Sequence, residues 1–127
     1  MIRELHTDIL VVGAGPAGCM AAVDLADRGV NVLVVDRFLF PREKICGDGL
    51  LEESIKILSG VGLDAAVREN AHPVDFIRFV APNGCECDLK GKLYTLRRQE
   101  LDALLLQAAC DRGADFQTGR VIAGIPQ

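Results

Sequence analysis

Three glycines at one-three-six spacing, Gly13, Gly15 and Gly18, separate two short runs of branched apolar residues. Apart from Asn31, the runs at residues 9–12 and 30–35 are continuous rather than alternating, which is typical of strands buried on both faces of a parallel sheet. Two parallel strands need a crossover connection, and that connection is usually a helix. This feature therefore predicts a strand, a glycine turn, a helix and a second strand over residues 9–35.

Residues 16–28 have the pattern of the connecting helix. Asp24, Asp27 and Arg28 are expected to point away from the sheet, and Gly29 occupies the position where a helix end favours positive φ. The predicted apolar face is small, which lets the helix lie close to the sheet. Its members are Ala17, Ala21 and Leu25 at every fourth position, with Gly18 and Ala22 beside them.

The glycine turn fits the fingerprint of a dinucleotide-binding unit. Asp36 ends the second run, 18 residues after Gly18 and close to the expected distance of about 20. Gly13 would make the tight turn, Gly15 would let a pyrophosphate approach the backbone, and Gly18 would let helix and strand pack closely. Free N–H groups and the helix dipole would complement the phosphates, and Asp36 would accept hydrogen bonds from a ribose. The alternative is a tight turn that holds no ligand.

The residues after the second strand predict a loop and a second helix. Residues 38–49 contain a proline and two glycines, which is typical of a loop. From residue 50 to about residue 59, Leu51, Ile55 and Leu58 share one face of a helix, which the glycines of residues 60–62 would end.

The remaining segments predict a hairpin, a third helix and one or two closing strands. Alternating residues at 74–90 are joined through Pro82, Asn83 and Gly84, a β-hairpin signal. The closing strands are expected at residues 116–125, with a break at Gly119. In the third helix, which Gly113 would end, the apolar positions are Leu101, Leu104, Leu105, Ala108 and Ala109. The predicted fold class is thus α/β, a Rossmann-like parallel sheet with flanking helices and an inserted β-hairpin.

Composition excludes several classes of protein. The net charge is -4, and the basic residues are scattered, so no nucleic-acid-binding surface is expected. No apolar run has the length of a signal peptide core or of a membrane span, which makes a cytoplasmic location the default expectation. The number of cysteines is odd, and Cys85-x-Cys87 has no CxxC pair to complete a metal site, so reduced thiols and no metal are expected.

Three segments together resemble a known family. "DILVVGAGPAGCMAA" with "VVDR" resembles the FAD-binding segment of the flavoprotein oxidoreductase and monooxygenase superfamily. "FPREKICGDGL" is similar to the Cys-Gly-x-Gly-Leu signature of the geranylgeranyl reductase family, a branch of the para-hydroxybenzoate hydroxylase-like flavoproteins. "RRQELDALLLQAACDRGA" is similar to that superfamily's Arg-x-x-Leu/Phe-Asp helix. The segments stand in the family's order and span most of the chain.

The resemblance implies a set of cofactor-binding residues for FAD. Asp36 would hold the adenosine ribose with Arg37 beside it, Arg98 would point back at the cofactor, and Val121 would meet the adenine through its backbone. The residues implied around the pyrophosphate are Gly13, Ala14, Gly15, Pro16, Ala17 and Gly18.

The resemblance also implies a role for the loop of Cys46, Gly47 and Asp48. Its backbone N–H groups would come close to the flavin or its ribityl chain. Cys46 is expected to be either a small buried residue or a reactive thiol near the flavin, and the catalytic residues stay unknown.

Residues 1–127 are expected to be the N-terminal portion of an FAD-binding domain and a fragment of a longer chain, because the family's later Gly-Asp segment and substrate motif are absent. The fragment is expected to be inactive and to bind FAD weakly. The resemblance implies that the parent passes electrons from NAD(P)H through FAD to an apolar, isoprenoid substrate. A lipid substrate leaves peripheral membrane contact open.

Three alternatives remain. The parent could be a flavin monooxygenase. An NAD(P)-dependent dehydrogenase would need a regular second βαβ unit soon after Asp36, which the hairpin and the Cys-Gly-Asp-Gly-Leu loop argue against. A non-catalytic nucleotide-binding module remains open because the chain shows no general acid–base pair or nucleophile arrangement.

Overall fold

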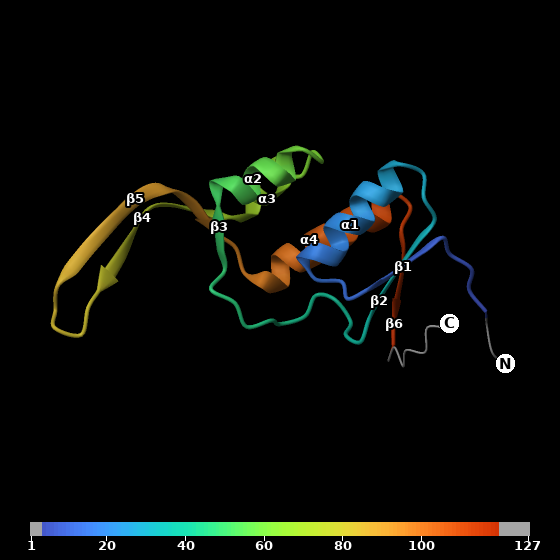
Figure 1. The fold of residues 1–127 in the computed structure, drawn as a ribbon, viewed down its shortest axis with the longest axis horizontal. Coiled ribbons are helices and arrows are strands. Elements are labelled where there is room, and N and C mark those ends of the chain that lie inside the picture. Colours follow the sequence, from blue (N-terminus) through green and yellow to red (C-terminus); the bar gives the residue numbers. More distant parts are fainter. Residues whose placement is uncertain (1–3, 120–127) are drawn as a thin grey trace. The chain divides into compact units, whose positions relative to one another are not determined.

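The computed structural model describes residues 4–119, which divide into two compact units (Figure 1). The glycine-loop unit contains residues 4–44 and 99–119, and the hairpin unit contains residues 45–98. Within residues 4–119, no helix combines the length and the apolar character needed to cross a bilayer.

The glycine-loop unit contains the predicted parallel sheet. Its strands are β1 (Ile9–Val12), β2 (Val32–Asp36) and β6 (Asp115–Thr118), in the order β1-β2-β6. The register pairs Ile9 with Val32 and Leu33 with Asp115. The α/β prediction is confirmed, although β2 begins two residues later than expected.

The prediction that β1 is buried on both faces is wrong for the described part of the chain. Leu10 is 51% exposed and Val12 is 63% exposed, whereas Val32 and Val34 of β2 are fully buried. The reason is position in the sheet, because β2 is the central strand and β1 is an edge strand. A continuous apolar run does not distinguish these two positions.

Helices α1 (Pro16–Asp27) and α4 (Arg98–Asp111) belong to the same unit, except that Arg98 falls in the hairpin unit. They lie side by side (Figure 1). The guanidinium of Arg112, just after α4, makes a 3.1 Å ion pair with Asp27 of α1. Gly29 and Gly113 follow the two helices with φ of 76° and 105°, as the sequence predicted.

The predicted inner face of α1 is confirmed at Ala22, which is fully buried, and at Gly18, which packs against the strand, but is wrong at its other three positions. Ala17 and Ala21 are exposed and Leu25 is only half-buried. A step of four residues overshoots one turn of a 3.6-residue helix by about 40°, so a line of every fourth residue leaves the buried face. The buried residues of α1, of which Ala22 was predicted, follow an i, i+3, i+4, i+7 pattern: Cys19, Ala22, Val23 and Ala26.

The predicted apolar face of α4 is largely confirmed. Leu104 is half-buried, and the face also takes in Leu106 and the carboxylate of Asp102, which has no exposed surface. The remaining predicted members are buried: Leu101, Leu105, Ala108 and Ala109.

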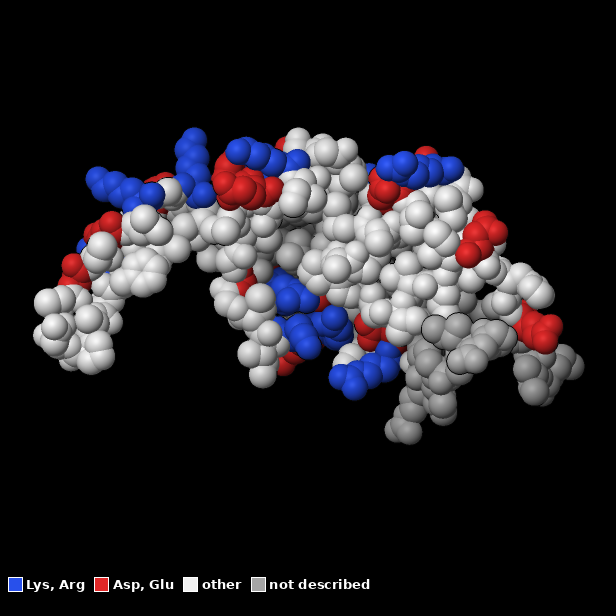
Figure 2. Space-filling model, viewed as in Figure 1, with Lys and Arg blue, Asp and Glu red and all other residues white. Residues whose placement is uncertain are grey.

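The hairpin unit has an antiparallel sheet with strand order β3-β5-β4. The predicted hairpin is confirmed as β4 (His72–Val80) and β5 (Glu86–Thr95), joined by a turn in which Gly84 has φ of 85°. Acidic and basic side chains lie next to one another on the surface over these two strands (Figure 2). The core of this unit is formed by Leu50, Ile55, Leu58, Leu63, Val67 and Leu96.

Two short elements of the hairpin unit differ from the prediction. Residues expected to begin the second helix form β3 (Gly49–Leu51), which pairs with the end of β5, so α2 (Glu52–Ser59) starts later. Leu51 is consequently 57% exposed and does not share the buried face of Ile55 and Leu58. Helix α3 (Asp64–Asn70), of which only Val67 is buried, was not predicted.

Candidate functional site

The glycine loop connects β1 to α1 through a backbone that requires glycine at two positions. Gly13 has φ of 105°, and its N–H donates to the carbonyl of Val35 at 2.8 Å. A Cβ atom on Gly18 would lie 1.9 Å from the carbonyl oxygen of Gly13 and 3.1 Å from a methyl of Val11. The close approach of helix and strand expected at Gly18 is therefore present.

The N-terminus of α1 is free of side-chain caps and of acidic residues. Gly15 is the N-cap, Pro16 begins the helix, and the first turn contains no acid. Pro16 has no N–H, and in the first turn of a helix the N–H groups of Ala17 and Gly18 have no acceptor within the helix. This end of α1 is thus electropositive and suited to an anion.

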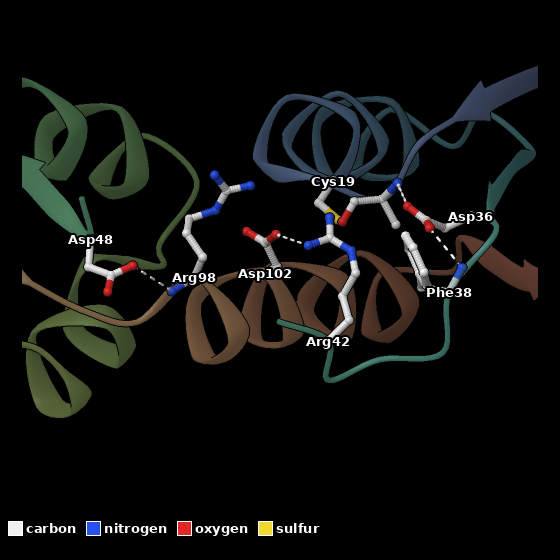
Figure 3. Close-up of polar contacts among 8 residues, drawn as sticks. Cys19, Asp36, Phe38, Arg42, Asp48, Arg98 and Asp102 are labelled. Atoms are coloured by element: carbon white, nitrogen blue, oxygen red, sulfur yellow. Dashed lines mark hydrogen bonds and ion pairs between the residues drawn. The ribbon is translucent and has the colours of Figure 1, made fainter. Parts of the chain in front are cut away.

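Asp36 ties the glycine loop to the end of β2 (Figure 3). The N–H of Ala14 donates to Oδ2 of Asp36 at 2.8 Å, and the N–H of Phe38 donates to Oδ1 at 2.9 Å. Asp36 as a whole is only 9% exposed. Each carboxylate oxygen has two lone pairs, so each keeps one for a further donor.

A cavity of about 260 Å³ lies at the carboxyl ends of β1 and β2. Ligands of open α/β sheets bind at this edge. A Cβ on Gly13 would meet no atom within 4 Å, and the guanidinium of Arg37 stacks on the ring of Phe38 at 4.8 Å. The cavity is lined by Val12, Gly13, Val35, Asp36, Arg37 and Gly119.

A buried charged pair, which the sequence did not predict, lies in the same unit. The guanidinium of Arg42 is 3.1 Å from the carboxylate of Asp102, and their side chains are 12% and 0% exposed. Beside it, the thiol of Cys19 donates to the carbonyl of Ala14 at 3.3 Å. Burial, with a contribution from the nearby Asp102 carboxylate, raises the pKa of Cys19 to about 12. The only sequence signal was an acid among the leucines of α4.

The hairpin unit brings Cys46, Asp48 and Arg98 together. Asp48 has φ of 56°, its side chain accepts the backbone N–H of Arg98 at 3.2 Å, and its carbonyl accepts that of Leu96 at 2.9 Å. Hydrogen bonds from the Asp48 backbone and then from the Arg98 guanidinium lower the pKa of the Cys46 thiol. Cys46 is exposed, so the alternative of a small buried residue is wrong.

The structure therefore forms two clusters from the predicted residues, one in each unit. The glycine loop, Asp36 and Arg37 gather in the glycine-loop unit, and Cys46, Asp48 and Arg98 gather in the hairpin unit. Gly47 is exposed beside Cys46. Val121 lies outside the described residues.

Several proteins that are similar in sequence to this chain are much longer than it is. The menaquinone reductase of Mycolicibacterium smegmatis is 35% identical in an alignment 129 residues long. The alignment covers 94% of this chain and 31% of that protein. The digeranylgeranylglycerophospholipid reductase 2 of Methanopyrus kandleri is 33% identical over 114 residues, which cover 89% of this chain and 28% of that protein. The chain spans about a third of the length of the curated relatives that it matches.

Solved structures show the same fold. The flavin-dependent brominase Bmp2 matches with a TM-score of 0.83 at 22% identity, over 97% of this chain and 32% of the brominase. The FAD binding domain family matches residues 6–127, which include both clusters. Because that match extends over nearly the whole sequence, this chain belongs to the FAD binding domain family.

Proposed function

We propose that the glycine-loop unit binds the adenosine diphosphate part of FAD at the carboxyl ends of β1 and β2. The observation that carries this proposal is the cavity lined by both Gly13 and Asp36, where the fold leaves space above the glycine and spare lone pairs on the carboxylate. Asp36 would accept hydrogen bonds from the ribose hydroxyls, with Arg37 beside it.

The pyrophosphate would lie against the N-terminal end of α1. The backbone from residue 13 to residue 18 would approach it closely, and the N–H groups of Ala17 and Gly18 would donate to its oxygens. The absence of an acid in this turn leaves the positive end of the helix dipole unopposed.

The residues of the hairpin unit are proposed to act toward the flavin. The exposed Cys46 thiol and the N–H groups of Gly47 and Asp48 would contact the flavin or its ribityl chain, and Arg98 would point at the cofactor. The contact of Val121 with the adenine stays a prediction.

For the whole protein, we propose electron transfer from NAD(P)H to an apolar, isoprenoid substrate, as in geranylgeranyl reductases. When bound, FAD supplies the two-electron chemistry, and the protein supplies orientation and exclusion of water. The Cys46–Leu50 signature and the similarity to a digeranylgeranylglycerophospholipid reductase support this substrate class. In this reaction a hydride from NAD(P)H and a proton from solvent add across a carbon–carbon double bond.

The binding proposal is tested by placing an acid in the first turn of α1. Ala17 is exposed and an acid in the first turn interacts favourably with the helix dipole, so Ala17→Asp should not lower the melting temperature, while repulsion of the pyrophosphate lowers the affinity for FAD about tenfold. Ala21→Asp, one turn further on the same exposed side, is the matched control and should bind FAD as the wild type does. FAD fluorescence anisotropy measures both, and equal affinities for the two variants would contradict the proposal.

The proposed reaction is tested on the whole protein with NADPH and an unsaturated isoprenoid lipid. Mass spectrometry should show a product that has gained a pair of hydrogen atoms and no oxygen. A gain of oxygen would indicate a monooxygenase instead, and FAD binding without turnover of any substrate tried would favour the non-catalytic module.

A further inference from the structure

The Arg42–Asp102 ion pair is buried beside apolar side chains of α4. Asp102 has no exposed surface and shares its face of α4 with Leu101, Leu105 and Leu106. Replacing a buried ion pair by apolar residues of similar volume is often neutral or stabilising, because the pair's desolvation cost is large. The pair therefore calls for an explanation other than the stability of the core.

The pair holds one end of the loop at residues 37–44. The guanidinium of Arg42 makes the 3.1 Å contact with Asp102 and lies over the ring of Phe40 at 4.8 Å. Phe40 in turn meets Phe116 of β6 edge to face, with 5.8 Å between ring centroids. Arg42 thus attaches the end of the loop to α4 and, through Phe40, to the sheet.

The other end of the same loop is held by the candidate site itself. The N–H of Phe38 donates to Oδ1 of Asp36, whose Oδ2 accepts the N–H of Ala14. Figure 3 shows both attachments, with Asp36 and Phe38 at one end of the loop and Arg42 on Asp102 at the other. Arg37, which lines the cavity, lies between Asp36 and Phe38 in the sequence.

A second path joins the pair to the glycine loop. Asp102 lies close enough to the buried thiol of Cys19 to act on it electrostatically, and that thiol donates to the carbonyl of Ala14. Ala14 is fully buried and donates its own N–H to Asp36. The ion pair is therefore connected to Asp36 through the 37–44 loop, and it also acts electrostatically on the Cys19 thiol, which is hydrogen-bonded to the glycine loop at Ala14.

We propose that Arg42 and Asp102 are positioning residues, which hold the 37–44 loop so that Asp36 and Arg37 face the cavity and thereby set the affinity for the adenosine side of the dinucleotide. This inference rests on the proposed FAD binding. A site held in its bound geometry before binding loses less conformational freedom when the ligand arrives.

The test replaces the pair by apolar residues. The double variant Arg42→Met with Asp102→Leu should keep the wild-type melting temperature within a few degrees and bind both FAD and ADP about tenfold more weakly. In Arg42→Met alone, Asp102 loses its guanidinium, so this variant should be less stable than the double variant. The exposed Asp24–Arg28 pair in the same unit is the matched control, and Asp24→Leu with Arg28→Met should leave affinity unchanged.

Amide hydrogen exchange gives a readout that a purely structural role would not change. In the double variant, the N–H groups of Phe38 and Ala14 should exchange faster, while the amides of α1 beyond its first turn keep their wild-type protection. Equal FAD affinity in the wild type and the double variant would overturn this inference and leave the proposed function standing. A full-length wild-type protein that does not bind FAD would overturn both.

Discussion

The glycine-loop unit and the hairpin unit differ in where they place their charged groups. In the glycine-loop unit, Asp36 and Asp102 are almost or wholly buried. In the hairpin unit, Arg78 pairs with Asp88 at 2.8 Å, a geometry as good as that of Arg42 and Asp102, but both side chains are more than a third exposed. The two Arg–Asp pairs thus share their chemistry and differ in solvent access.

This difference in solvent access separates buried charged groups, which fix the positions of neighbouring segments, from exposed ones, which do not. An exposed ion pair is screened by water and contributes little to stability. A buried carboxylate that accepts backbone N–H groups, as Asp36 does, holds two loops in one arrangement, and losing it leaves donors unsatisfied. We therefore expect substitutions of Gly18 and Asp36 in the glycine-loop unit to affect both folding and FAD binding, and matched substitutions in β5 of the hairpin unit to affect neither.

The largest effect is expected at Gly18. In Gly18→Ala, the new Cβ would lie 1.9 Å from a backbone oxygen, so the glycine loop must move away from α1. We expect the free energy of unfolding to fall by about 3 kcal/mol or more, with loss of FAD binding. Gly91→Ala in β5, where a Cβ meets no atom within 4 Å, should unfold like the wild type. Urea titrations of both variants measure this, and equal losses would contradict the comparison.

A smaller effect is expected at Asp36. Asp36→Ala removes the acceptor of the Ala14 and Phe38 N–H groups, so the free energy of unfolding should fall by about 2 kcal/mol. FAD affinity should fall as well, because the ribose loses its acceptor. The counterpart in the hairpin unit is Asp88→Ala, which should change neither quantity measurably because this aspartate is exposed. A larger loss of stability at Asp88 than at Asp36 would reverse the comparison.

The smallest effect concerns thiol reactivity, which should differ between Cys46 and Cys19. The pKa of Cys46 is lowered by hydrogen bonds from the Asp48 backbone and from Arg98, so its alkylation by iodoacetamide should begin at a lower pH than that of an ordinary thiol. Arg98→Gln should move this pH profile upward. Peptide mass mapping follows each site, and an unchanged profile in the variant would exclude the role of Arg98.

Cys19 behaves in the opposite sense. Its pKa is raised from 9.0 to about 12 in the folded chain, chiefly by burial, so it should resist alkylation below pH 9. Because the folded state keeps a proton that the unfolded state loses above about pH 9, this thiol's contribution to stability is complete below that pH and is lost as the pH rises toward 12. Cys19→Ala should unfold with a weaker dependence on pH in that window.

Local patterns were enough to predict the elements that surround the site. The connection from β1 through the glycine loop and α1 to β2 was predicted because glycine conformations and short apolar runs depend on neighbouring residues. The hairpin turn at Gly84 and the end of α4 before Gly113 were predicted for the same reason. Helix α3 was missed because seven residues with one buried side chain carry almost no periodic signal.

The features that only the tertiary structure decided depend on residues far apart in the sequence. β1 is exposed because it lies at the edge of the sheet, and β3 forms because Gly49 pairs with Thr95. Asp102 is buried because Arg42, sixty positions earlier, reaches it. The sequence by itself thus determined the glycine loop and its place between strand and helix, since those follow from backbone sterics and local hydrophobic spacing. Solvent access and charge pairing depend on which distant segments the fold brings together, so they were decided by the tertiary structure.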